Sequence, residues 1–528
     1  MKREFAALRE QQFDLLICGG GIYGAWTAYD AALRGLKVAI VEQGDWASAT
    51  SSASSKLIHG GLRYLESYDF KLVKKALKER QLLLQIAPHR VWPLRFGVPV
   101  YASSRISRLQ LKLGLMLYDF LAATPLHKMA HRYFNRSAFS RHFPALDTTG
   151  LKGGFTYSDA QTDDARLVLE LINGALDAGA VCVNYCKLSS LIASDGKATG
   201  AVVQDKLGTA EISVQAKQIV YATGQWSATG QESKQWCRVT KGVHLILPAY
   251  HSDEALLLTA QADGRVFFII PWYGLTLLGT TDTDYTGDMQ NIVAEETEVA
   301  YLLDAANFYL KTAWCKTDVI GSYAGLRVMK CSDKSSPSAV SRDWELKTSA
   351  SGVHYSIGGK ITSAREDAAS IVDEVCKALD IESTCASNWR LLPWAPQQEF
   401  TAWHATASAH AEQLHIDPES IKWLLRRHGK RVDEIFREIE REPLLAERIV
   451  PTVPIIQADL LFCARNEMAV HLDDLLRRRM PLMILAVLNE SVLRSLALLV
   501  AIPMAWDETD IEREVLVCMA ANKPKFFN

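Results

Sequence analysis

Apolar and small residues follow one another in a regular order just after the polar start of the chain. The apolar run FDLLIC (residues 13–18) predicts a short buried strand, and the alanine-rich stretch AWTAYDAAL predicts a helix. A second apolar run, LKVAIV, predicts another strand, which ends at Glu42. This order is typical of an α/β unit in which a helix connects two neighbouring strands.

Later segments show two kinds of pattern. Apolar runs within VYATGQWS and KGVHLILP predict strands, whereas the residues beyond LLPWAPQQEF (391–400) are charged and leucine-rich with a helical period. The most apolar stretch, which starts near residue 480, is interrupted by Asn489, Glu490 and Arg494. It falls short of the ~20 uninterrupted apolar residues that a membrane span requires, so we expect a buried helical hairpin there.

A Gly-x-Gly-x-x-Gly motif lies between the first predicted strand and helix. Gly19 allows a tight turn, Gly21 lets backbone N–H groups approach a pyrophosphate at the helix N-terminus, and Gly24 lets helix and strand pack closely. Glu42, on the order of 20 residues downstream, stands where a carboxylate accepts hydrogen bonds from ribose hydroxyls. This combination predicts a dinucleotide site; the alternative is a purely structural glycine turn.

The segment TSSASSKLIHGGLRYLE (50–66) favours FAD over NAD at this site. A nicotinamide-binding Rossmann domain normally continues promptly into its next strand and helix, but this chain inserts a long hydroxyl-rich loop instead. Serine hydroxyls and backbone amides of such a loop can surround the pyrophosphate and ribityl chain of a flavin.

Composition narrows the function classes. The 528 residues leave room for two or three domains, at roughly 100 to 200 residues each. The net charge of -2 gives no general attraction to nucleic acid, so we expect none as a partner. The ten cysteines include no C-x-x-C pair and no zinc-like spacing, which indicates a reduced, cytoplasmic compartment and no metal site. The N-terminus resembles neither a signal nor a transit peptide.

Motifs along nearly the whole chain resemble a known family. They are GGGIYGAWTAYDAALRGLKVAIVE, TSSASSKLIHGGLRYLE, FTYSDAQTDDARLVLE, VYATGQWS, KGVHLILP, GTTDTDY, YAGLRV and IGGKITSAR. Their order and spacing are similar to those of the FAD-dependent sn-glycerol-3-phosphate dehydrogenases, the aerobic, quinone-linked type. The segment ADLLFCARNEMAVHLDDLLRRRMPL is similar to the helical C-terminal domain of that family.

The resemblance implies the fold of the D-amino-acid-oxidase-like flavoproteins, of class α/β + α. A discontinuous Rossmann-type FAD-binding domain would comprise residues 1–80, 145–230 and 341–390. A substrate or cap domain with a mixed sheet would comprise 81–144 and 231–340. An all-helical C-terminal domain would comprise 391–528.

The resemblance also implies the chemistry. Such an enzyme oxidises the C2 hydroxyl of glycerol 3-phosphate to a ketone: a hydride passes from C2 to N5 of non-covalently bound FAD, and a base removes the hydroxyl proton. The product is dihydroxyacetone phosphate, and the electrons go on to a quinone. The site therefore needs a cationic phosphate pocket, a proton acceptor and a flavin held against C2.

The family motifs place substrate-binding residues on this chain. Arg63, Tyr64 and Arg327 are expected at the phosphate, because the planar guanidinium matches phosphate oxygens and a hydroxyl adds a donor. Alternatives are a solvated arginine at Arg63 and a structural ion pair at Arg327. Lys360 follows two glycines, and its ammonium could hold phosphate or favour the anionic reduced flavin.

Two histidines compete for the role of base, and Arg327 is counted with them among the catalytic residues. His244, at the start of the apolar run in KGVHLILP, is the first candidate, because an imidazole can be neutral and basic near neutral pH. Its alternative is a structural histidine bonded to backbone. His59, the second candidate, lies in the hydroxyl-rich loop, where a flavin contact is equally natural.

The residues expected to contact FAD combine the glycine motif, the hydroxyl-rich loop, the turn after a later strand, and the Gly-Gly-Lys segment. They are Gly19, Gly21, Ile22, Tyr23, Gly24, Glu42, Thr50, Ser51, Ser54, Ser55, Lys56, Leu57, His59, Gly224, Gly359, Lys360, Ile361 and Thr362.

Three positions depart from the family pattern. Gln225 and Val328 replace prolines, and Ala364 replaces a tyrosine. Loss of proline loosens the backbone, so the departures put the substrate in question more than the cofactor. A dehydrogenase for another polyol phosphate, such as erythritol phosphate, and an oxygen-using oxidase therefore remain alternatives, with a non-catalytic FAD-binding relative as a third.

The segment Ser103–Ala122 combines arginine and lysine with leucines and a methionine. A basic rim beside an apolar cluster is typical of a helix that lies in the headgroup plane of a membrane. The leucines also recur at alternate positions, so packing within the cap is the alternative. We expect peripheral attachment to the inner face of the cell membrane; whether the chain forms a homodimer stays open.

Overall fold

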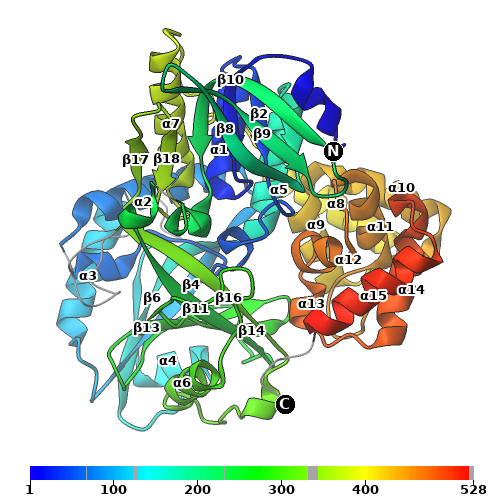
Figure 1. The fold of residues 1–528 in the computed structure, drawn as a ribbon. Helices are drawn as coiled ribbons and strands as arrows, with labels where there is room; N and C mark the ends of the chain where they lie inside the picture. Colours follow the sequence, from blue (N-terminus) through cyan, green and yellow to red (C-terminus); the bar gives the residue numbers. More distant parts are fainter. Residues whose placement is uncertain (67, 123–128, 231, 331–342, 523–528) are drawn as a thin grey trace.

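The computed structural model describes residues 1–66, 68–122, 129–230, 232–330 and 343–522, which form two sheets with their helices and a separate helical region (Figure 1). The boundary expected near residue 340 lies outside the described residues. The other expected domain limits stay predictions.

The first sheet contains the predicted N-terminal unit. Its central strands run parallel, with β1 between β10 and β2, β18 beyond β10, and β7 beyond β2. The antiparallel strands β17, β8 and β9 complete it. The bounds are β1 (Phe13–Cys18), β2 (Val38–Val41), β7 (Val181–Val183), β8 (Cys186–Ser194), β9 (Lys197–Asp205), β10 (Glu211–Tyr221), β17 (Glu345–Thr348) and β18 (His354–Ile357).

Three helices pack together on one face of this sheet: α1 (Ile22–Leu33), α5 (Asp164–Asp177) and α7 (Ala364–Ala378). Helix α1 is rich in alanine and its interior side chains are buried, because it lies between the sheet and both neighbouring helices. Its N-terminus therefore points at the carboxyl ends of the parallel strands, where nucleotides bind in such sheets.

The second sheet is mixed and lies below the first in Figure 1. Its strands are β3 (Leu57–Ile58), β4 (Val91–Tyr101), β5 (Arg132–Asn135), β6 (Leu151–Thr162), β11 (Cys237–Leu247), β12 (Ala255–Thr259), β13 (Val266–Trp272), β14 (Leu275–Gly279), β15 (Thr283–Asp284) and β16 (Gly321–Lys330). Strand β6, which the sequence analysis assigns to the FAD-binding part, pairs with β4 in this sheet.

Helices α2 (Phe70–Ile86), α3 (Arg108–Leu121), α4 (Arg136–His142) and α6 (Glu296–Asn307) accompany the second sheet. Between the two sheets run the short segments η2 (Thr50–Ser52) and η3 (Leu62–Leu65), which belong to the hydroxyl-rich loop. The loop thus lies where the two sheets meet.

The region after residue 391 is helical, as predicted, and lies at the right of Figure 1. It contains α8 (Phe400–Gln413), α9 (Pro418–His428), α10 (Val432–Arg441), α11 (Gln457–Asn466), α12 (Leu472–Asp474), α13 (Leu482–Leu485), α14 (Glu490–Met504) and α15 (Glu508–Asn522). A π-helical turn, Leu475–Arg479, follows α12. In the part of the chain that the structure describes, no helix combines the length and apolarity needed to cross a bilayer.

The apolar stretch near residue 480 differs from the expected buried hairpin. Helix α14 buries Leu493, Leu496 and Val500 against the other helices, but Leu498 and Ile502 are exposed, the latter by 92%. The stretch therefore forms the short, buried helix α13 and the amphipathic helix α14, and the expectation of full burial is wrong for the outer face of α14.

Candidate active site

A cavity of about 360 Å³ lies between the two sheets and brings together most of the predicted site residues. Those that line it are Gly21, Ile22, Tyr23, Thr50, Ser51, Ser54, Ser55, Leu57, His59, Arg63, Tyr64, Gly224, His244, Arg327, Gly359, Lys360 and Ile361. They come from segments spread over more than half of the chain, so the fold assembles one site from distant motifs.

Five predicted residues, all within the described ranges, lie outside the lining of this cavity. They are Gly19, Gly24, Glu42, Lys56 and Thr362. Each lies behind the residues that line the cavity and supports them. A Cβ atom on Gly24 would lie 1.9 Å from the Gly19 carbonyl oxygen, so only glycine lets α1 approach β1 this closely. The Glu42 carboxylate accepts hydrogen bonds from the backbone N–H groups of Gly20 (2.6 Å) and Gly44 (2.8 Å).

The geometry at the N-terminus of α1 fits a dinucleotide. The Ile22 N–H lies there as a donor and bonds to Ser51 Oγ at 2.9 Å. Such amides, together with the positive end of the helix dipole, are the donors that pyrophosphate needs. On the far side, a Cβ atom on Gly359 (φ 98°) would lie 1.7 Å from Tyr23 Oη, so glycine alone lets this turn close over α1. The residues present therefore fit FAD.

The hydroxyl-rich loop is held in place by one buried carboxylate. Asp164, at the start of α5, accepts hydrogen bonds from Ser54 Oγ and from Lys56 Nζ, each at 2.6 Å. Lys56 is only 3% exposed, so its ammonium pairs with Asp164 and points away from the cavity. The Tyr323 hydroxyl adds a bond to the Ser54 carbonyl oxygen at 2.7 Å. The loop is thus a preorganised wall of the site.

His244 lies in β11 and is 1% exposed. Its ring stacks on Tyr323, with centroids 4.8 Å apart and an interplanar angle of 18°, and its Nε2 is hydrogen-bonded to Ser55 Oγ at 2.8 Å. Among the described residues, Nδ1 has no hydrogen-bond partner. Burial, and then the nearby cations Arg327 and Lys56, lower the pKa of His244 well below its usual value. The imidazole is therefore neutral at neutral pH, the protonation state from which a base acts.

His59, the competing histidine, also lines the cavity and is partly exposed. Its backbone N–H donates to Thr362 Oγ1 at 3.1 Å, which joins the hydroxyl-rich loop to the segment after Lys360. Both histidines therefore face the same space, and their positions alone do not separate their roles.

Arg327, on β16, points into the cavity beside a turn that follows β14. Its guanidinium donates to Thr280 Oγ1 (2.8 Å), to the Thr281 carbonyl oxygen (3.1 Å) and to Asp282 Oδ1 (3.1 Å). These bonds hold the planar group in one orientation, which is what two-point recognition of a phosphate needs.

The other predicted cations approach from two different segments. Arg63 and Tyr64 lie on η3, and the Lys360 ammonium lies 3.8 Å from the centre of the Tyr64 ring. The cation–π contact fixes the Lys360 side chain against the tyrosine. Positively charged side chains therefore line one part of the cavity.

Sequence reasoning missed Arg265, which also lines the cavity, just before β13. Its Nη1 donates to the Asp282 carbonyl oxygen at 2.7 Å, so Arg265 and Arg327 are anchored to the same residue. The available signal was an arginine directly before an apolar strand, RVFFIIPW, but neither composition nor spacing marked it out.

Comparison with known proteins identifies the class of protein. A family model described as "FAD dependent oxidoreductase" matches residues 14–365, and one described as "C-terminal domain of alpha-glycerophosphate oxidase" matches residues 397–511. The chain is therefore an FAD-dependent oxidoreductase of the D-amino-acid-oxidase type, and the predicted fold and cofactor are confirmed.

Individual relatives narrow the family. The chain is 35% identical over 503 residues to a glycerol-3-phosphate dehydrogenase of Synechocystis sp., covering 90% of each chain. It is 32% identical over 498 residues to an aerobic glycerol-3-phosphate dehydrogenase of Bacillus subtilis, covering 90% of this chain and 88% of the relative. A crystal structure of the glycerol-3-phosphate dehydrogenase from Bacillus halodurans, complexed with FAD, superposes with a TM-score of 0.79 at 28% identity, covering 99% and 98% of the two chains. The chain belongs to the FAD-dependent glycerol-3-phosphate dehydrogenase family.

Proposed function

We propose that this protein oxidises sn-glycerol 3-phosphate to dihydroxyacetone phosphate and that the electrons pass on to a quinone. The observation that carries the proposal is the composition of the 360 Å³ cavity, where a flavin site, four cations and two histidines meet. Bound FAD supplies the hydride acceptor for oxidation at C2.

The charge of the cavity suits a small dianion. Its lining includes Arg63, Arg265, Arg327 and Lys360 against two carboxylates, Asp159 and Asp282. Asp159 is already paired with Arg80, which lies behind the wall. The excess of positive charge in a partly buried space favours a phosphate ester over a neutral polyol, because a desolvated dianion needs more than one cation.

Proton removal is assigned to His244, with His59 as the alternative. A base must reach the C2 hydroxyl while the phosphate is held by the arginines, and His244 lies in β11 beside β16, which carries Arg327. The Tyr323 stack and the Ser55 bond hold the ring in one orientation, so proton transfer needs no search by the side chain.

The three departures from the family pattern change little of the lining of the 360 Å³ cavity. Val328 lines the cavity, but Ala364 is fully buried at the first residue of α7 and Gln225 lines a different cavity. The phosphate-facing cations would serve any polyol phosphate, so the preference for glycerol 3-phosphate over erythritol phosphate rests on the relatives, which are named glycerol-3-phosphate dehydrogenases.

Anaerobic reduction tests this proposal. The purified yellow protein should bleach on addition of glycerol 3-phosphate and transfer its electrons to a soluble quinone analogue faster than to oxygen. Bleaching with another polyol phosphate only would refute the substrate. Rapid peroxide formation with poor quinone reduction would show an oxidase, and a flavin that no polyol phosphate reduces would show a non-catalytic relative.

We also propose peripheral attachment to the inner face of the cell membrane through α3. The exposed apolar residues of α3 fall on one helical face: Leu109, Leu113, Met116, Leu117 and Phe120. Leu115 and Tyr118 face inward, so the leucines at alternate positions divide between the two sides of the helix. Arg105, Arg108 and Lys112 lie beside the apolar face, which suits an anionic lipid surface.

Vesicle sedimentation tests the attachment. The protein should bind phosphatidylglycerol vesicles more strongly than phosphatidylcholine vesicles, and Leu113→Asp combined with Phe120→Asp should abolish binding. Ile502→Asp, which alters an even more exposed apolar residue on α14, is the control and should leave binding intact. Equal binding by all three proteins would exclude α3 as the attachment site.

A further inference from the structure

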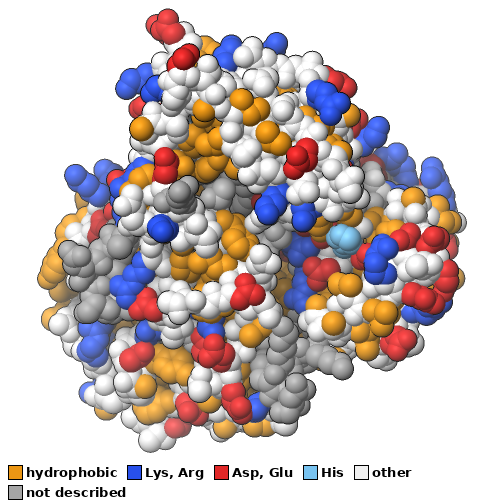
Figure 2. All heavy atoms as spheres, in the orientation of Figure 1, with side chains coloured by type: hydrophobic (Ala, Val, Ile, Leu, Met, Phe, Trp, Pro, Cys, Tyr) orange, Lys and Arg blue, Asp and Glu red, His pale blue; other side chains and the backbone are white. Residues whose placement is uncertain are grey.

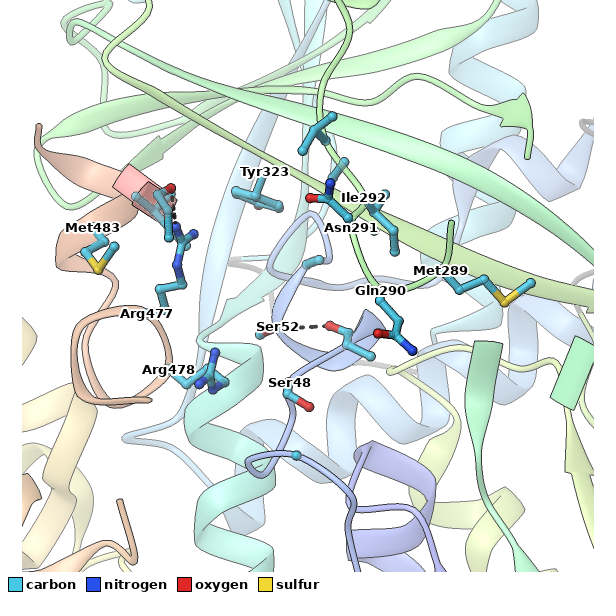
Figure 3. A pocket seen from close by; sticks show the side chains of 18 of the residues that line it. Ser48, Ser52, Met289, Gln290, Asn291, Ile292, Tyr323, Arg477, Arg478 and Met483 are labelled. Carbon is cyan, nitrogen blue, oxygen red and sulfur yellow. Dashed lines mark hydrogen bonds between the residues drawn. The ribbon is translucent and has the colours of Figure 1, made fainter. Parts of the chain in front are cut away.

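A second cavity, of about 660 Å³, lies where the two sheets meet the helical C-terminal region. Figure 3 shows Arg477 and Arg478 on one side of it, facing Ser48 and Ser52 of the loop after β2 on the other. In Figure 2, lysine and arginine side chains gather around the hollow where the helical region adjoins the rest of the molecule. The helical region therefore forms one wall of a space that the first sheet also lines.

The position of this cavity follows from the order of strands in the first sheet. Strands β2 and β10 flank β1, and the residues that follow both of them line the cavity: Gln43 and Gly44 after β2, and Trp226 after β10. Gln43 directly follows Glu42, the carboxylate placed for ribose hydroxyls.

The two cavities adjoin each other at the start of the hydroxyl-rich loop, where Ala53 lines both of them. The 360 Å³ cavity includes Gly21 and Ser51, and the 660 Å³ cavity includes Ser48 and Ser52. A dinucleotide whose pyrophosphate lies at the N-terminus of α1 extends in two directions from it. Since the flavin end belongs with the histidines and Lys360, the adenosine end is directed toward Glu42 and the second cavity.

A cluster of buried ion pairs joins the helical region to the loop of residues 43–49, which follows β2 and lies on the adenosine side. Asp45 is 1% exposed and accepts hydrogen bonds from Arg478 Nε (2.6 Å) and Arg479 Nη2 (2.9 Å). Arg479 also donates to the Glu467 carbonyl oxygen at 2.7 Å, which fixes it within its own region. The π-helical turn Leu475–Arg479 places these two consecutive arginines on the same acceptor.

Further contacts involve Trp46 and Gly44, the two residues on either side of Asp45. The Trp46 indole N–H donates to Met468 Sδ at 3.4 Å, and the ring packs so closely on Gly20 that a Cβ atom there would lie 2.4 Å from it. The Gly44 carbonyl oxygen accepts from the Tyr185 N–H at 2.9 Å, and the Tyr185 hydroxyl donates to Asp474 Oδ1 at 2.6 Å. The helical region thus contacts Asp45 and Trp46 directly and is linked to Gly44 through Tyr185.

We propose that the helical C-terminal domain is part of the FAD site: Arg478 and Arg479, acting through Asp45, position the loop that holds the adenosine half of the cofactor. Residues 43–49 form no regular helix or strand, so an unanchored loop would lose conformational freedom each time FAD binds. The buried ion pairs remove that freedom beforehand and thereby raise cofactor affinity. The arginines are positioning residues, because they act through Asp45.

Cofactor binding to the apoprotein tests this role. Arg479→Met should weaken binding of FAD, and of ADP as a probe of the adenosine half, by about tenfold. FMN, which lacks the adenosine, should bind with unchanged affinity. The KM for glycerol 3-phosphate at saturating FAD should also be unchanged. Arg448→Met, which breaks the Arg448–Asp417 ion pair inside the helical domain, is the matched control and should leave all four values unchanged.

Unchanged FAD and ADP affinity in folded Arg479→Met would overturn the proposal, and so would equal weakening of FAD and FMN. If that variant fails to fold, hydrogen exchange on the wild-type apoprotein decides the matter. ADP should protect amides of residues 43–49 and of residues 472–479 together; protection of the first segment alone would refute the coupling. These readouts use no substrate, so they are independent of the proposed reaction.

Discussion

Replacing Arg327 by alanine should raise the KM for glycerol 3-phosphate by about 30-fold, while the protein stays folded and loaded with FAD. Truncating one partner of a hydrogen-bonded charge pair costs roughly 2 to 5 kcal/mol when the pair is buried. The Arg327 side chain is 22% exposed, and Arg63, Arg265 and Lys360 remain, so the lower end applies. About 2 kcal/mol corresponds to about 30-fold in affinity, at about 1.4 kcal/mol per tenfold.

Two features of the structure sharpen this expectation. Arg327 pairs with the 4% exposed Asp282 carboxylate, so its removal also leaves that negative charge, close to the phosphate, with one cation fewer. Arg327→Lys keeps the charge but loses the planar fork that bonds to Thr280 and Asp282, so it should recover only part of the affinity.

Steady-state kinetics, together with the dissociation constant of inorganic phosphate as a competitive inhibitor, measure the effect. Arg238→Ala is the matched control, because Arg238 lies on the neighbouring strand β11 and pairs with the exposed Asp284. An unchanged KM and an unchanged phosphate constant in folded, FAD-loaded Arg327→Ala would refute the assignment of Arg327 to the phosphate.

Three further predictions address the base, the cofactor turn and the domain contact. His244→Gln should lower kcat by on the order of 100-fold with little change in KM. Because burial lowers the pKa of His244, the wild-type pH profile of kcat/KM should stay flat from pH 8 down to 6.5. If kcat/KM instead falls within that range, and still does so in His244→Gln, the base would be His59. Gly24→Val should abolish FAD binding and lower the melting temperature, since its Cβ would lie 1.9 Å from the Gly19 carbonyl oxygen; a variant that retains FAD would disprove this packing argument. Glu467→Gln should lower the free energy of unfolding at pH 7 by roughly 3 to 5 kcal/mol, because it breaks the buried ion pair with Arg166. Burial raises the pKa of Glu467, but Arg166 and Arg431 outweigh burial and hold this pKa well below 4.5. The stability difference between wild type and Glu467→Gln should therefore shrink only as pH falls below 4.5. Urea titrations in which that difference does not vary with pH would contradict this prediction.

The predictions that held rest on contiguous residues. The order of strand, glycine turn, helix and strand around Gly19–Gly24 was readable because each element has its own periodicity and the turn has a backbone requirement. The helical C-terminal region was readable from its period and from the proline-rich segment before it. The hydroxyl-rich loop could be singled out because its chemistry lies within one short stretch, and it lines the cavity; its contact with FAD stays a prediction.

The failures involve side chains whose surroundings come from elsewhere. Full burial was expected for α14, yet Ile502 is exposed, because none of the elements that the structure describes covers that face. The leucines of α3 could not be divided between an inner and an outer side until the sheet beneath them was known. The partner of the Lys56 ammonium, Asp164, also lies far away in the sequence, and the contact of Lys56 with FAD stays a prediction.

By itself, the sequence determined the local conformations, the dinucleotide motif and the identity of the chemical groups available. The tertiary structure alone decided which of those groups meet. It joined Arg265 to Arg327 through Asp282, and it joined Asp45 to Arg479, which lies 434 residues away. The physical reason is that periodicity and turn chemistry act between neighbours along the chain, whereas an ion pair or a cavity wall depends on how separate elements pack.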